Sequence, residues 1–270
     1  MTSRGGVRRV PQRPPWPLVV LGVLGALLFA LPLAGLVART PWRNLHELIA
    51  SDVVVDALWL SLVTSLAATA LSLILGVPLA WLLARVEFPG RHLVRAVVTL
   101  PMVLPPVVGG AALLFALGRR GLVGEPIEEA TGFILPFSIW GVIVANTFVA
   151  MPFLVITVEG ALAGIDKGYE RAAATLGASR LTVFRRVTLP MIGPSLWAGA
   201  VLAWARALGE FGATVTFAGN LQGRTQTLPL AVFVALESDR DTAVAISLVL
   251  VAVSLVVLVA MRDRWWGRAT

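Results

Sequence analysis

Two oppositely charged residues, Arg206 and Glu210, stand inside a long apolar run, where they are candidates for passing an ion rather than for catalysis. Residues four apart in a helix lie on the same face, so these side chains can meet. A charge inside a membrane costs at least a few kcal/mol unless it is paired or wetted. Mutual neutralisation is therefore one interpretation of the pair. The other, which we favour, is a position at a pore or its gate.

The residue types behind several common catalytic chemistries are missing from this sequence. Cysteine is absent, which excludes disulfides, thiolate catalysis and cysteine metal sites. The two histidines, His46 and His92, fall on opposite sides of the predicted membrane and cannot share a metal ion. A P-loop needs Gly-Lys followed by Ser or Thr, whereas the sole lysine, Lys167, precedes Gly168. We therefore expect no enzyme activity and no cofactor, with energy supplied by a partner.

The composition predicts an all-α integral membrane protein. The chain has 270 residues, of which 57% are hydrophobic and 14% charged, and its mean hydropathy is +0.85. A soluble domain of this size could not bury so much apolar surface. A spanning helix needs about 20 mostly apolar residues. Lipid cannot form hydrogen bonds with exposed backbone groups, so runs of this length are expected to be helices. The expected spans cover about residues 16–38, 56–84, 93–118, 133–158, 194–218 and 242–261.

The distribution of positive charge predicts the orientation of these spans. A net charge of +7 would suggest a nucleic-acid partner in a soluble protein, but here lysine and arginine concentrate in alternate loops, so no nucleic acid is expected. The bias places both termini and the loop 159–193 in the cytoplasm. The first apolar run is longer than the core of about 7 to 15 residues of a secretory signal, which favours a retained helix over a cleaved one. We expect a basic tail at 1–15 and one membrane domain at 16–270.

The cytoplasmic loop 159–193 carries signals for two short helices. Asp166 can cap the first by accepting hydrogen bonds from its free amide groups, and Gly177 can end it in a left-handed turn. Ser179 can cap a second helix that reaches Val187. We expect Leu189-Pro190 to stop it, because proline does not continue a helix interior. The result would be a compact knob suited to a socket on another subunit.

The residue order in this loop resembles the EAA loop of ABC importer permeases, written E-A-A-x3-G-x9-I-x-L-P. In that family the loop forms a short coupling helix that docks into a cleft on the ATP-hydrolysing subunit. The family's Glu position is Arg171 here, with Glu170 just before it. The alternative is an amphipathic helix–turn–helix without a docking role. The resemblance assigns ATPase coupling to Glu170, Arg171, Ala172, Ala173, Gly177, Leu189 and Pro190.

A second resemblance covers residues 206–231 and narrows the substrate. The run Gly-Ala-Thr-x-Thr-Phe-Ala-Gly-Asn at 212–220 and the run Thr-Leu-Pro-Leu-Ala at 227–231 are more similar to molybdate permeases than to sulfate ones. This adds Thr214 to the expected translocation pathway, beside Arg206 and Glu210. Asn146, in the fourth span, either faces this pathway or belongs to a packed kink near Pro152.

The resemblance implies a type I ABC importer permease in the lipid bilayer of a prokaryotic inner membrane. It implies a homodimer with the pathway at the two-fold axis, two cytoplasmic ABC ATPase subunits, and an extracytoplasmic molybdate-binding protein. Transport would proceed by alternating access. Molybdate and tungstate are nearly identical in size and charge, so the sequence does not separate them. A sulfate or thiosulfate permease, a membrane-embedded enzyme and a passive anion channel remain as alternatives.

Overall fold

The computed structural model describes residues 15–266, with side chains described for residues 15–259, and the regular elements in this range are helices. The expected basic tail at 1–15 lies almost wholly outside the described residues. In chain order the helices are α1 (Trp16–Ala38), α2 (Leu45–Ile49), α3 (Asp52–Arg85), α4 (Arg91–Thr99), α5 (Pro106–Leu117), α6 (Gly124–Thr131), α7 (Ile139–Gly164), α8 (Lys167–Thr175), α9 (Arg180–Val183), α10 (Leu189–Leu208), α11 (Gly212–Phe217), α12 (Leu228–Ser238) and α13 (Arg240–Trp266). The expected all-α membrane fold is confirmed.

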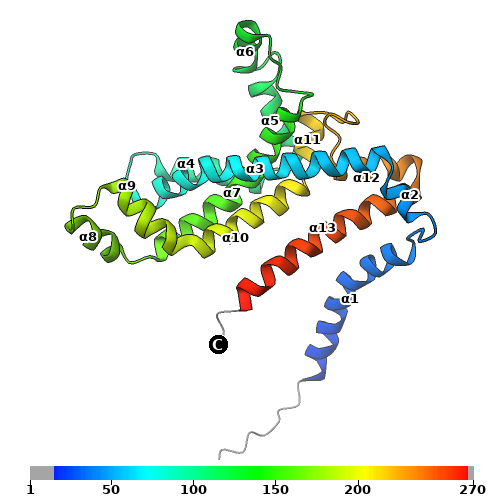
Figure 1. Ribbon diagram of the computed structural model, residues 1–270, viewed down its shortest axis with the longest axis horizontal. Coiled ribbons are helices and arrows are strands. Elements are labelled where there is room, and N and C mark those ends of the chain that lie inside the picture. The colour runs from blue at the N-terminus through cyan, green and yellow to red at the C-terminus, as the bar shows by residue number, and fades with distance from the viewer. Residues whose placement is uncertain (1–14, 267–270) are drawn as a thin grey trace, which may run out of the picture.

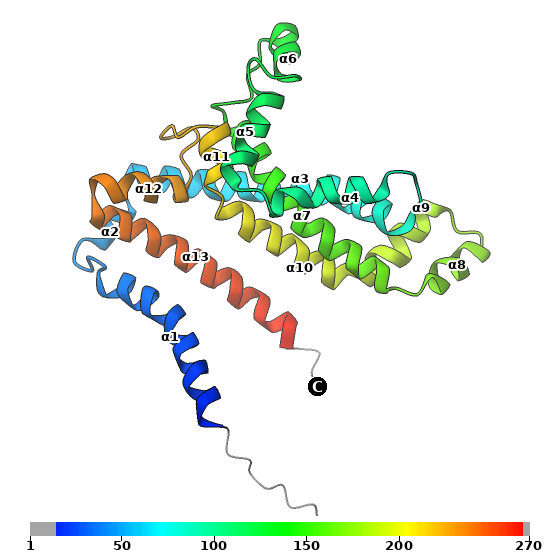
Figure 2. The same cartoon turned by 180° about the vertical axis from the view of Figure 1, so that it is seen from behind.

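The core of the molecule is a bundle in which α3, α7 and α10 lie side by side (Figures 1 and 2). Small residues let these helices approach closely, as is usual where lipid supplies no hydrophobic drive for helix association. A Cβ on Gly76 of α3 would lie 3.2 Å from the Leu154 side chain, and one on Gly199 of α10 would lie 3.1 Å from it. The indole nitrogen of Trp204 donates to the Ser65 hydroxyl at 2.8 Å and adds a polar tie between α10 and α3.

Within the described residues, five helical segments are long and apolar enough to cross a membrane, and a sixth span is possible if α4 and α5 count together. The first expected span, 16–38, coincides with α1. The fourth expected span ends at 158, whereas α7 continues to Gly164. The turn between α7 and α8 therefore begins later than the expected loop 159–193. In Figure 1, α8 and α9 lie at one end of the bundle and α2 and α12 at the other.

The expected span at 93–118 is not one straight helix, because the chain bends by 119° between α4 and α5. The two helices together form either a broken span or a re-entrant loop. A 3₁₀ turn, Leu100–Met102, lies at the bend. Pro101, Pro105 and Pro106 have no backbone amide hydrogen to donate to a helical hydrogen bond. The helix therefore cannot pass straight through this segment. After the bend, α5 and α6 project away from the bundle as an arm, here called the α5–α6 arm (residues 106–131; Figures 1 and 2).

The expected fifth span, 194–218, is also not one helix. A continuous helical segment runs over Arg180–Leu208, starting earlier than expected, and the chain then breaks before the short helix α11. α11 packs against α5 at very short range, since a Cβ on Gly110 would lie 2.8 Å from the carbonyl oxygen of Ala213. The break therefore lets α11 pack against the base of the α5–α6 arm.

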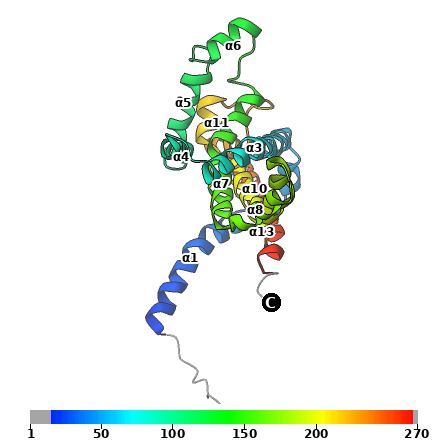
Figure 3. The same ribbon diagram turned by 90° about the vertical axis from the view of Figure 1, so that its left-hand side faces the viewer.

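Two parts of the chain remain largely uncovered. No residue of α1 is buried, although this helix is apolar throughout. Seen along the bundle in Figure 3, α1 and the α5–α6 arm extend to opposite sides. Phe115 and Leu122 of the arm region are 75% and 87% exposed. Lipid or further protein must cover these apolar surfaces in the membrane.

Candidate functional site

The first helix of the predicted knob, α8, has the cap and the end expected from its sequence. The Asp166 carboxylate accepts a hydrogen bond from the Gly168 amide at 2.8 Å. At the other end Gly177 has a φ of +85°, in the left-handed region that favours glycine. The Ala178 amide donates back to the Ala173 carbonyl at 3.2 Å and closes the turn. Both local predictions are confirmed.

The second helix of the knob begins as predicted, with the Ser179 hydroxyl accepting from the Thr182 amide at 3.3 Å. The prediction that Leu189-Pro190 would stop this helix is wrong. A π-helical turn, Phe184–Thr188, carries the chain into α10 without a break. The Leu189 amide donates to the Phe184 carbonyl, five residues back. This wider turn accommodates the ring of Pro190, which has no amide hydrogen for a normal helical bond.

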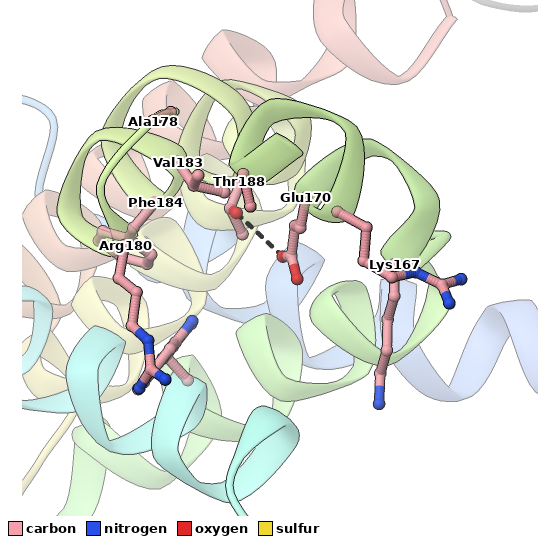
Figure 4. Close-up of a pocket in the computed structure, with 10 residues that line it drawn as sticks. Lys167, Glu170, Ala178, Arg180, Val183, Phe184 and Thr188 are labelled. Atoms are coloured by element: carbon pink, nitrogen blue, oxygen red, sulfur yellow. Dashed lines mark hydrogen bonds between the residues drawn. The ribbon is translucent and has the colours of Figure 1, made fainter. Parts of the chain in front are cut away.

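Glu170 is directed into its own chain rather than outward. Its Oε1 accepts a hydrogen bond from Nη2 of Arg85 at 3.1 Å. The same oxygen accepts from the Thr188 hydroxyl at 2.9 Å (Figure 4). The Arg85 side chain is only 7% exposed, and Thr188 is buried. One carboxylate thus joins α8 to the end of α3 and to the π-helical turn before α10. The sequence held no signal for this contact, because four helices, α4 to α7, separate Arg85 from α8 along the chain.

The two faces of α8 differ in what they contact. Lys167, Glu170, Arg171 and Ala174 repeat at helical spacing and line a cleft between α8, α9 and α3. The opposite face carries Tyr169, Ala172 and Leu176, and the tyrosine and leucine are 60% and 89% exposed. Ala173 is half-buried beside them, and Leu189 and Pro190 lie at the start of α10. An exposed apolar face flanked by alanines suits close docking against another protein surface.

Arg206 and Glu210 form the ion pair that their spacing suggested, but not on one helical face. Nη1 of Arg206 lies 2.5 Å from Oε2 of Glu210. Glu210 stands in the break after α10, and its other oxygen accepts from the Ala213 amide at 2.6 Å, at the start of α11. The Glu210 side chain is 1% exposed and that of Arg206 is 28% exposed. The guanidinium of Arg206 is thus held at the break between α10 and α11, and part of the side chain remains exposed on the surface of the single chain.

Asn146 and Thr214 meet in the interior. The Thr214 hydroxyl donates to Oδ1 of Asn146 at 3.2 Å, and Nδ2 of Asn146 lies 3.5 Å from the Thr64 hydroxyl. The three side chains are 0–2% exposed in the single chain. They connect α11, α7 and α3 directly behind the break that holds Glu210. Of the four residues expected in the pathway, Arg206 therefore has a partly exposed side chain, and the other three are buried in the single chain.

A further ion pair was not foreseen from the sequence. Arg95 of α4 contacts the carboxylate of Glu159 on α7 through both Nε, at 3.0 Å, and its terminal nitrogen. The Glu159 side chain is 14% exposed. The pair fixes the first half of the bent α4–α5 segment to the bundle. A signal was available, since two isolated charges at the ends of neighbouring expected spans favour pairing.

Comparison with known proteins gives consistent matches. The family model described as "Binding-protein-dependent transport system inner membrane component" matches residues 76–265. The molybdenum transport system permease protein ModB of Mycobacterium tuberculosis is 46% identical over 242 residues, covering 90% of this chain and 91% of the relative. The protein of the same name from Escherichia coli K12 is 41% identical over 213 residues, covering 79% and 93%.

More distant similarities agree on the fold. The sulfate transport system permease protein CysT of Salmonella typhimurium is 37% identical over 239 residues, covering 87% of this chain and 86% of that protein. A solved bacterial ABC transporter that imports the acidic polysaccharide alginate superposes with a TM-score of 0.71 at 20% identity. The match covers 94% of this chain and 95% of the chain in that structure, and it supports the arrangement of helices alone.

Proposed function

The chain belongs to the family of binding-protein-dependent transport system inner membrane components, and on this premise we propose that it carries molybdate or tungstate into the cell as the permease of an ABC importer. It is a multi-pass protein of the inner membrane and a non-catalytic subunit. Its partners are an ABC ATPase and a periplasmic binding protein. The substrate assignment rests on the relatives named for molybdenum transport, which have higher sequence identity to this chain, 46% and 41%, than the sulfate permease, at 37%.

The observation that carries the transport mechanism is the construction of α8. Its outward face, with Tyr169 and Leu176, is free for an ATPase, while its inward face is tied through Glu170 to α3 and to the start of α10. Two ATPase subunits, one under each permease, would therefore move these helices when they close on ATP. Ala172 and Ala173 keep the docking surface small, and Gly177 keeps its final turn in shape, whereas Arg171 lies on the cleft face of the same helix.

We assign Arg206 to the translocation pathway. Its partly exposed guanidinium can meet a dianion, while Glu210 offsets part of its charge and fixes its position. Such an arrangement suits brief transit better than tight binding, so selectivity falls mainly to the binding protein. Asn146 and Thr214 support the break from behind. The pathway would then open alternately to each side of the membrane as the helices around this break shift.

A second copy of the chain completes the channel in this proposal. The apolar surfaces of α1 and of the α5–α6 arm are uncovered in the single chain, so either can supply contact area for a second copy related by a two-fold axis. One permease alone holds a single Arg206 beside an open side. Two copies would enclose a pathway between them.

The test is transport by the assembled complex in proteoliposomes. We expect the complex of permease and ATPase to hydrolyse ATP and take up anion when its binding protein is supplied with micromolar molybdate or tungstate. Equimolar sulfate should give neither response. Equal stimulation by sulfate would move the chain to the sulfate branch, and ion flux through the permease without ATPase would make it a channel.

A further inference from the structure

A basic cleft lies at the cytoplasmic end of the bundle, on the side of α8 that faces away from its exposed apolar surface. It measures about 380 Å³ between α3, α8 and α9, and its lining includes Lys167, Arg171 and Arg180. In Figure 4 the side chains of Lys167 and Arg180 extend to the same side, with Glu170 between them. Glu170 cannot neutralise them, because its carboxylate is already engaged by Arg85.

Among the residues whose side chains the structure describes, these three cations have no ion-pair partner. Over residues 15–259, the ion pairs involve Arg85, Arg95, Arg119, Arg206 and His46, and none involves a cation of the cleft. Unpaired cations that converge on one cleft attract an anion, and phosphate oxygens are strong acceptors for arginine and lysine. The charge and the volume of the cleft therefore suit a small anionic group.

An apolar groove of about 270 Å³ adjoins this cleft. It is lined by Pro78, Trp81, Leu181 and Phe184, and Arg180 belongs to both the groove and the cleft. The rings of Trp81 and Phe184 meet edge to face with centroids 6.3 Å apart and form its floor. Apart from the guanidinium of Arg180, the groove offers no charged group. The groove suits the hydrocarbon chain of an amphipathic molecule whose anionic group lies beside Arg180.

The groove opens onto a surface that leads into the membrane. On α3, the residues Leu71, Ile74, Pro78 and Trp81 recur every three or four positions and so share one face. Leu71 and Ile74 line another apolar groove further along the helix, and Ile74 is 67% exposed. A continuous apolar track thus runs from the middle of the helix to the basic cleft at its cytoplasmic end.

We propose that the cleft and groove bind one anionic phospholipid of the cytoplasmic leaflet, with its phosphate at Lys167, Arg171 and Arg180 and an acyl chain in the groove. A zwitterionic lipid is disfavoured because its ammonium group would meet the same cations. The lipid bridges α3 to α8 and α9, the parts already joined by Glu170 and Arg85. It therefore stiffens the unit that passes ATPase movement to the membrane helices.

This inference rests on the orientation in the proposed function, which places α8 in the cytoplasm. The ATPase is the competing occupant of the cleft. The geometry favours lipid, because the apolar docking face of α8 with Tyr169 and Leu176 points the other way, while the cleft continues into an apolar track along α3.

The experiment uses the complex of permease and ATPase, reconstituted in nanodiscs of phosphatidylcholine with or without phosphatidylglycerol. Lipid retained after transfer to detergent is counted by native mass spectrometry. We expect preferential retention of phosphatidylglycerol, reduced about fivefold by Arg180→Gln and again by Lys167→Gln. Arg186→Gln is the matched control, since Arg186 is an exposed arginine of the same segment that does not line the cleft. Added glycerol phosphate should not displace the lipid.

Three outcomes would overturn the proposal. These are equal retention of the two lipids, equal effects of Arg180→Gln and Arg186→Gln, and loss of ATPase copurification by Arg180→Gln with lipid retention unchanged. The last would make the cleft part of the ATPase interface. A wild-type permease that fails to copurify with any ATPase would instead refute the proposed function, whatever its lipid retention.

Discussion

The carboxylate of Glu170 lies 3.1 Å from Nη2 of Arg85, so the short helix α8 is anchored to the C-terminal end of α3. The same oxygen accepts from Thr188, which precedes α10 by one residue. A push on α8 is therefore delivered to two long helices of the bundle at once. A helix held only by its flanking loops would tilt without moving them.

Removal of Glu170 should uncouple transport. Glu170→Ala strands the largely buried Arg85, and breaking such a pair costs about 3–5 kcal/mol when it is fully buried, less here because Glu170 is partly exposed. We expect lower thermal stability and reduced uptake per ATP hydrolysed. The double variant Arg85→Glu with Glu170→Arg should recover part of both. Glu237→Gln serves as control, because Glu237 is an exposed carboxylate of α12. Normal coupling in Glu170→Ala would rule out the anchor.

Gly177 should tolerate asparagine better than valine. Nothing lies within 4 Å of a Cβ built on this residue, so a side chain has space and the backbone alone is limiting. At a φ of +85° a β-branched residue is strained by about 1–2 kcal/mol, whereas asparagine visits this region more readily. We expect Gly177→Val to reduce uptake and ATPase copurification while membrane abundance is kept. If the valine and asparagine variants behave alike, the turn does not shape the docking surface.

The features that the sequence predicted correctly depend on residues close together in the chain. The caps at Asp166 and Ser179 and the turn at Gly177 depend on a few neighbouring residues, and the structure has them as expected. The prediction for Pro190 failed because a π-helical turn can absorb a proline ring, and nothing in the local sequence distinguishes this from a helix stop.

Long-range features were less accessible. Pro101, Pro105 and Pro106 signal a break between α4 and α5, but the size of the bend, 119°, and the packing of α5 against α11 do not follow from the local sequence. The partners Arg85 and Glu170 come from separate helices, and a single sequence does not pair them. The ion pair of Arg206 and Glu210 was predicted, but from a continuous helix that is in fact broken between them.

Gly110 should admit no larger residue, because α5 and α11 touch through it. A Cβ there would lie 2.8 Å from the carbonyl oxygen of Ala213, a backbone atom that cannot move aside. Overpacking of this kind costs about 1–3 kcal/mol. We expect Gly110→Ala to lower the thermal unfolding temperature in detergent. Gly160→Ala is the matched control within α7, where a Cβ meets nothing within 4 Å. Equal stability of the two variants would show that the α5–α11 contact is loose.

The pair of Arg206 and Glu210 offers the sharpest test of the pathway. Arg206→Leu leaves the Glu210 carboxylate, 1% exposed, with only the Ala213 amide as partner. Glu210→Leu leaves a partly exposed guanidinium that water can reach, so it should damage folding less. Breaking a buried pair costs about 3–5 kcal/mol, whereas replacing both partners by apolar residues is often close to neutral.

We therefore expect the double variant, Arg206→Leu with Glu210→Leu, to reach the membrane and bind the ATPase better than Arg206→Leu alone. Its molybdate uptake should nevertheless be lost, because no cation then remains at the break to meet the anion. Arg206→Lys, which keeps the charge, should retain part of the uptake. Membrane abundance, ATPase copurification and uptake are measured on the same preparations. A double variant that folds and transports at the wild-type rate would show that the pair only neutralises itself, and Arg206 would then have no place in the pathway.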